Sequence, residues 1–157
     1  MMIDWVTAKI PFNAPGRLHD GQVMSFNRDG EVKYLIDQRL PVEGSHSERI
    51  HVRTAGLDLN GNTCLIEFSG NPVKFLQGHN LWGSSDLLNL MYESVLKVAE
   101  LLGLPQPTEV LERLKAGTYT LSRVDLNEMY QFRDRAEVLA WLYTASQTSR
   151  TRSQGAV

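Results

Sequence analysis

The stretch "IDWVTAKIPF", residues 3–12, alternates between two sets of side chains with a period of two residues. A period of two is that of a β-strand, because successive side chains point to opposite faces of a sheet. The two sets are Ile3, Trp5 and Thr7 on one side and Asp4, Val6 and Ala8 on the other. We expect Pro11 to end this strand and residues 13–21 to form a loop.

The next stretches continue the strand pattern. "VMSFNRDGEVKYLI", residues 23–36, reads as two strands joined across residues 28–30, which is a hairpin signal. "RIHVRTAG", residues 49–56, and "NTCLIEFSG", residues 62–70, flank an Asn-Gly turn at residues 60–61. Residues 3–69 therefore predict antiparallel β-structure.

The period changes in the second half of the chain. Ser84, Ser85 and Asp86 offer a helix N-cap, and the apolar residues that follow recur every three or four positions until Gly103. Residues 108–117 predict a short helix with Thr108 as its cap, residues 118–126 a strand, and residues 135–146 a last helix. The apolar side of that last helix would consist of Val138, Leu139, Trp141 and Leu142.

This order of elements predicts an α+β fold, in which an antiparallel sheet has helices packed on one face and its other face free for a ligand or partner. The chain has 157 residues, 42% of them hydrophobic, which suits one domain over residues 1–147 with a polar, basic tail at 148–157. A single cysteine, Cys64, and the lack of a signal-peptide pattern or a membrane-length apolar run predict a cytoplasmic protein without a membrane partner.

The net charge of −2 is not typical of a nucleic-acid-binding domain. The distribution of charge is more informative, because the last ten residues contain Arg150 and Arg152 and no acid. This end of the chain could contact phosphate groups, or it could simply be a solvated terminus.

Two strands carry candidate metal ligands. If Val124 packs under the helices, Arg123 and Asp125 share the open face of the sheet, where a carboxylate is a suitable ligand for Mg²⁺ or Mn²⁺. Glu67 would join Asp125 there if the two strands are neighbours. The alternatives are an Arg–Asp cross-strand pair and a solvated glutamate, neither of which has a chemical role.

The stretch "KFLQGHNLWGSSDL", residues 74–87, places a histidine and a tryptophan in a turn before a helix. His79 could bind a metal or transfer a proton, and Trp82 could stack on an unpaired base. Ser84, Ser85 and the helix N-terminus could hold a phosphate group. The alternative is a tryptophan packed beneath the loop, with Asn80 stabilising the turn by hydrogen bonds.

Four blocks occur in one order: "MIDWVTAKIPF", "NPVKFLQGHNLWGSSDL", "TLSRVDL" and "SRTRSQG". Together they resemble the N-terminal part of the filamentous-phage replication initiators of the gene II/gene X type, from Met2 to Gly155. The resemblance implies a fold related to rolling-circle replication initiators. It also implies an enzyme that nicks and rejoins one strand of the phage origin through a tyrosine, with Mg²⁺ or Mn²⁺ as cofactor.

The resemblance also suggests roles for individual residues. Glu67, His79 and Asp125 would surround the metal as catalytic groups. The DNA contacts, to the single- and double-stranded origin, would be made by Gln77, Asn80, Trp82, Arg123, Arg150 and Arg152. The implied setting is the cytoplasm of a bacterial host, with host replication proteins as further partners.

The pattern departs from the family in one respect, since family members continue beyond the "TRSQ" block into the region expected to hold the nucleophilic tyrosine. We therefore expect only the N-terminal part of an initiator here, with Tyr119 and Tyr130 as weak substitutes. One alternative is a non-catalytic DNA-binding or regulatory fragment. Another is a subunit that docks through the open sheet face and has no nucleic-acid role.

Overall fold

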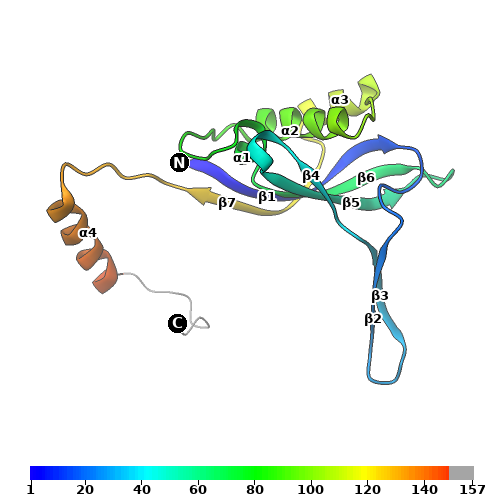
Figure 1. The fold of residues 1–157 in the computed structure, drawn as a ribbon, viewed down its shortest axis with the longest axis horizontal. Coiled ribbons are helices and arrows are strands. Elements are labelled where there is room, and N and C mark those ends of the chain that lie inside the picture. Colours follow the sequence, from blue (N-terminus) through cyan, green and yellow to red (C-terminus); the bar gives the residue numbers. More distant parts are fainter. Residues whose placement is uncertain (149–157) are drawn as a thin grey trace. The chain divides into compact units, whose positions relative to one another are not determined.

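The computed structural model describes residues 1–148. Contacts divide the chain into two units, Met1–Asn127 and Glu128–Val157, where the sequence had predicted one domain over residues 1–147. The first unit has the predicted α+β fold, a sheet covered by helices (Figure 1). None of the described helices is long and apolar enough to cross a membrane.

A five-stranded antiparallel sheet forms the centre of the first unit, in the order β4-β5-β6-β1-β7. β1 is the longest strand, and it pairs with β6 on one side and β7 on the other. The strands span Met2–Ala14 (β1), Leu40–Glu43 (β4), Arg49–Leu57 (β5), Thr63–Gly70 (β6) and Thr120–Asn127 (β7).

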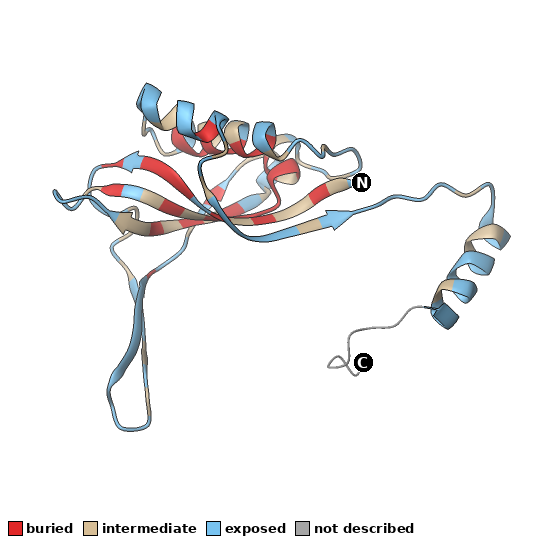
Figure 2. Cartoon of the chain, turned by 180° about the vertical axis from the view of Figure 1, so that it is seen from behind, coloured by how far each residue is buried: buried red, intermediate tan, exposed pale blue. Residues whose placement is uncertain are grey.

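The helices of this unit lie on one face of the sheet (Figure 1). They are α1 (Pro72–Gln77), α2 (Leu87–Leu101) and α3 (Thr108–Lys115). Asp86 caps α2 as predicted, because its carboxylate accepts a hydrogen bond from the Asn89 amide at 3.0 Å. Buried residues line the layer between the helices and the sheet (Figure 2), among them Val6, Ile10, Val52, Ile66, Phe68, Phe75, Met91, Val95, Val98 and Leu114.

The predicted hairpin is confirmed as a separate two-stranded sheet of β2 (Gln22–Phe26) and β3 (Val32–Asp37). It extends from the sheet on the side away from α2 and α3 (Figure 1). Most of its apolar side chains are exposed, which follows from the lack of a third strand or a helix against it.

The second unit contains α4 (Arg135–Thr148), close to the predicted boundaries. None of the residues of this helix is buried against the described part of the chain. The Trp141 ring instead lies near two aromatic rings of the preceding segment, with centroid distances of 5.3 Å to Tyr130 and 5.8 Å to Phe132.

Three details of the prediction were wrong. Pro11 does not end β1, because the pairing with β7 stops at Lys9 and the missing N–H of Pro11 needs no partner on that side. Thr108 is the first residue of α3 and not its cap, which is Pro107. The sequence pattern also failed to indicate the short elements α1, β4 and the 3₁₀-helix Ser45–Ser47.

Candidate functional site

The face of the sheet opposite the helices carries a polar surface, which we call the open face. The strand register arranges its side chains in rows across the strands. Trp5 lies opposite Asp125, and in the next row Thr7 lies between Ser69 and Arg123. A third row consists of Arg53, Glu67 and Lys9.

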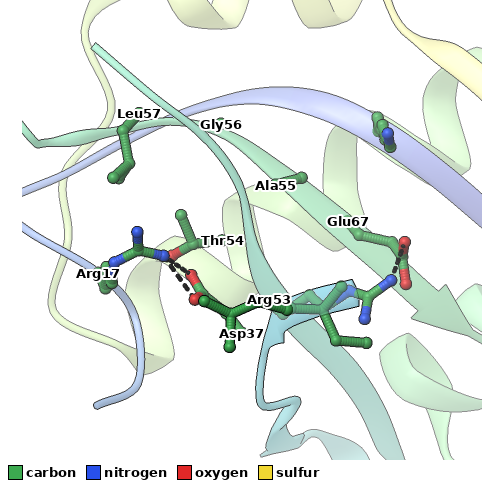
Figure 3. Close-up of a pocket in the computed structure, with 11 residues that line it drawn as sticks. Arg17, Asp37, Arg53, Thr54, Ala55, Gly56, Leu57 and Glu67 are labelled. Carbon is green, nitrogen blue, oxygen red and sulfur yellow. Dashed lines mark hydrogen bonds and ion pairs between the residues drawn. The ribbon is translucent and has the colours of Figure 1, made fainter. Parts of the chain in front are cut away.

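Glu67 is held by two arginines. Its carboxylate accepts a hydrogen bond from Arg53 Nη2 at 2.7 Å and another from Arg39 Nη2 at 3.0 Å (Figure 3 shows the Arg53 side). Burial by itself raises the pKa of Glu67, but the hydrogen bonds and positive charges of Arg53 and Arg39 outweigh it. The pKa of Glu67 therefore lies below its ordinary value of 4.5.

We expect the Glu67 ion pairs to stabilise the fold at neutral pH and to weaken in acid. Because the folded pKa is lowered, this contribution is present above pH 4.5 and is lost as the pH falls through the folded pKa. Glu67→Gln should lower the free energy of unfolding by about 1–3 kcal/mol at pH 7, since two guanidinium groups lose their charged partner. Urea unfolding from pH 7 to pH 3 should show this difference shrinking.

Glu43→Gln is the matched control for this experiment. Glu43 pairs with Arg49 at 3.0 Å on the same sheet, but its side chain is 51% exposed. An exposed pair contributes little, so this variant should stay close to the wild type at every pH. If the free energies of unfolding of Glu67→Gln and the wild type differ by the same amount at pH 7 and pH 3, the ion-pair explanation is contradicted.

Arg123 and Asp125 form a bidentate pair on β7. Arg123 Nε and Nη2 donate to the two Asp125 carboxylate oxygens at 2.9 and 2.5 Å. This hydrogen bonding lowers the pKa of Asp125, and the charge of Arg123 acts in the same direction. The guanidinium carbon also lies 5.7 Å from the centre of the Trp5 ring. The predicted Arg–Asp pair is thus present, within one strand and not across two.

The end of α1 and the loop after it hold four of the predicted site residues. His79 and Trp82 are exposed, whereas Gln77 and Asn80 donate hydrogen bonds to other parts of the protein. Gln77 Nε2 donates to the backbone oxygens of His79, at 3.1 Å, and Trp82, at 2.5 Å. Asn80 Nδ2 donates to Asp4 Oδ1 at 2.9 Å, which fixes the loop to β1. His79 is exposed and the Trp82 side chain is 75% exposed, so Trp82 is not packed beneath the loop.

The phosphate site predicted at Ser84 and Ser85 does not fit the structure. The Asp86 carboxylate already accepts a hydrogen bond from a backbone amide of the first turn of α2. A negative charge at that position repels a phosphate group.

The structure does not bring Glu67, His79 and Asp125 together as one metal site. β1 separates β6 from β7, and Glu67 is offset from Asp125 by four residues of β1, which places their Cα atoms about 16 Å apart. Both carboxylates are also paired with arginines. Within residues 1–148, no group of three or more His, Cys, Asp or Glu side chains is arranged to hold a metal ion.

Tyr119 and Tyr130, the two tyrosines that the sequence offered as weak substitutes for the nucleophile, both have raised pKa values. Burial, and to a lesser degree the charge of Asp86, raises the pKa of Tyr119. Tyr130 donates a hydrogen bond to Glu128 at 2.8 Å, and this bond raises the pKa of Tyr130. A raised pKa makes loss of the hydroxyl proton harder, whereas the Glu128 carboxylate beside Tyr130 is a group that can accept that proton.

Sequence reasoning missed the cations around Glu67. Arg39 lies in the link between β3 and β4. Arg53 and Lys9 are the cross-strand neighbours of Glu67 on β5 and β1. The alternation along "RIHVR" places Arg53 on a polar face, but only the register shows that this residue lies opposite Glu67. Arg150 and Arg152, predicted to contact DNA, lie outside the described residues.

Comparisons with known proteins agree with the four sequence blocks. A family model for the N-terminal part of the phage replication-associated protein, the gene II protein, matches residues 2–157. The replication-associated protein of the same name from Enterobacteria phage I2-2 is 38% identical over 152 residues, which are 96% of this chain and 44% of that protein. The chain thus spans less than half the length of this relative. No solved structure gives a significant match.

Proposed function

Because the chain belongs to the family of phage replication-associated protein N-terminal domains, we propose that it is the DNA-binding N-terminal part of a phage rolling-circle replication initiator. The family match over nearly the whole chain is the observation that carries this proposal. The proposed partner is the phage origin, as single- and double-stranded DNA, in the cytoplasm of the bacterial host. Host replication proteins would join it there.

Exposed groups on the first unit support a role in DNA binding. Trp82 presents its ring to solvent on a loop that Gln77 and Asn80 hold in place. An exposed, fixed ring can stack on an unpaired base, which typically contributes about 1–3 kcal/mol. Arg123 extends from the open face with its side chain 59% exposed, although Asp125 neutralises much of its charge.

The reaction proposed for the complete initiator is transfer of a phosphodiester to a tyrosine. The tyrosine oxygen bonds to phosphorus, the bond from phosphorus to the 3′ oxygen breaks, and the 3′ hydroxyl leaves with a proton. We assign this role to no tyrosine of the described residues. The requirement for Mg²⁺ or Mn²⁺ stays a prediction, since Glu67, His79 and Asp125 do not lie close enough together to bind one ion.

A second function is regulatory DNA binding without nicking. The position of β1 between β6 and β7 favours it, because Glu67 and Asp125 do not come together and residues 1–148 contain no group of three metal-ligating side chains. Incubation of the chain with supercoiled plasmid bearing the phage origin, in Mg²⁺ or Mn²⁺, separates the two functions. Relaxed plasmid supports nicking, and intact plasmid with retained binding supports regulation.

We expect Trp82→Ala to weaken binding of a fluorescent single-stranded oligonucleotide by about 5- to 100-fold, from the loss of one stacked base. The fold should be unaffected, because the side chain is 75% exposed. Fluorescence anisotropy measures the affinity and circular dichroism the fold. Leu59→Ala, at a fully exposed apolar residue, is the control and should bind like the wild type. Equal affinity of Trp82→Ala and the wild type would exclude Trp82 from the interface.

A further inference from the structure

A concave trough lies where the β2–β3 hairpin meets the sheet. Two hollows of about 390 and 540 Å³ share Ile36, Asp37 and Arg53 among their lining residues, so they adjoin at the base of the hairpin. Figure 3 shows the first hollow, with Arg17, Asp37, Arg53 and Glu67 around it. Neither hollow includes the loop with His79 and Trp82.

The charge of the trough is opposite in sign to that of the chain. Four cations line it together with two carboxylates, an excess of two positive charges in a chain whose net charge is −2. The cations are Lys9, Arg17, Arg39 and Arg53, and the carboxylates are Asp37 and Glu67. A concave cationic surface concentrates the field and attracts anions.

Donors in the trough remain available for a ligand. Arg39 and Arg53 each use only Nη2 toward Glu67, so among the described residues their Nε and Nη1 groups have no side-chain acceptor. Lys9 is exposed, and its ammonium group has no ion-pair partner in residues 1–148. Glu67 holds the two guanidinium groups in place, which reduces the entropy that they lose on binding a phosphate group.

The wall of the trough is apolar. Val23, Leu35 and Ile36 of the hairpin line it and are 44%, 47% and 37% exposed. A DNA duplex buries its bases and presents mainly phosphates and sugars, whereas a single strand presents phosphates and apolar base faces together. The combination of unused guanidinium and ammonium donors with an exposed apolar wall fits a single strand better.

We propose that this trough binds a segment of single-stranded DNA, with the phosphates on Lys9, Arg39 and Arg53 and the bases against the hairpin. The inference rests on the proposed function and adds a binding site separate from the Trp82 loop. Arg17, whose Nη1 is occupied by Asp37 at 2.5 Å, fixes the hairpin base to the loop after β1.

The test is the affinity of Lys9→Gln/Arg39→Gln for a fluorescent single-stranded oligonucleotide at several salt concentrations. These changes spare the fold, since Lys9 is exposed and Arg53 continues to pair with Glu67. We expect affinity to fall about 10-fold or more, and the slope of log affinity against log salt to shrink by about 1.4 for two lost phosphate contacts. For a duplex of the same sequence, the double variant should lose less affinity than it does for the single strand.

Arg49→Gln is the matched control, an exposed arginine on β5 outside the trough and paired with Glu43. It should bind like the wild type. Wild-type affinity of the double variant, an equal loss in Arg49→Gln, or an equal loss of affinity for duplex and for single strand in the double variant would each overturn the trough site. A wild-type chain that binds no DNA would overturn the proposed function itself, so the two failures are distinguishable.

Discussion

Replacing Phe68 by alanine is expected to lower the free energy of unfolding by about 3–5 kcal/mol. Phe68 lies on β6 between its cross-strand partners Ala8 and Val52, and its side chain is fully buried against the helix layer. Truncation removes the apolar contact area and leaves a cavity that rigid neighbours cannot fill. Domains of this kind have a total stability of about 5–15 kcal/mol, so the loss should be plain in urea unfolding at 25 °C.

Phe26→Ala is the matched control for this prediction, because it makes the same chemical change at a side chain that is 57% exposed on the hairpin. Its cost should be below about 1 kcal/mol. Similar losses in the two variants would show that the layer between sheet and helices is not the core of the fold.

Replacing Gly78 by alanine is expected to cost about 2–5 kcal/mol. Gly78 ends α1 with a φ of 83°, a left-handed conformation that costs other residues about 1–2 kcal/mol. An added Cβ would also overlap the His46 imidazole, and overpacking typically costs about 1–3 kcal/mol more. The loop with His79 and Trp82 should shift as well, because it begins at this residue.

Two comparisons separate these causes. Gly30 has the same φ of 83°, but no atom lies within 4 Å of the position that an added Cβ would take. Gly30→Ala should therefore show the cost of the left-handed backbone alone. His46→Gly removes the overlapping atoms, so Gly78→Ala should cost no more in that background than Gly30→Ala does in the wild type. An undiminished cost in the His46→Gly background, by urea unfolding, would rule out the clash.

Local sequence patterns predicted the elements that depend on neighbours in the chain. α2 begins after Asp86 because a short carboxylate side chain accepts a hydrogen bond from an amide of the first turn. The hairpin forms around residues 27–31, where Asn27 Oδ1 accepts hydrogen bonds from the Asp29 and Glu31 amides. Both contacts span four residues or fewer, so they can be read from the sequence.

The predicted site failed where it depended on strand order. Glu67 and Asp125 do share the open face, as the period of two indicated, but β1 lies between their strands. The sequence does not state which strands are neighbours. That order follows from how the apolar faces of all strands are buried together under α1, α2 and α3.

By itself, the sequence determined the α+β class, the helix and strand segments other than α1, β4 and the 3₁₀-helix, the outward face of β6 and the family, since these follow from periodicity, caps, turns and four matching blocks. Only the tertiary structure decided that Glu67 pairs with Arg39 and Arg53, and that the cations gather at the hairpin base. The physical reason is that such pairings join residues 14 and 28 positions apart in the chain. Their distances are set by sheet register and core packing, which no local pattern encodes.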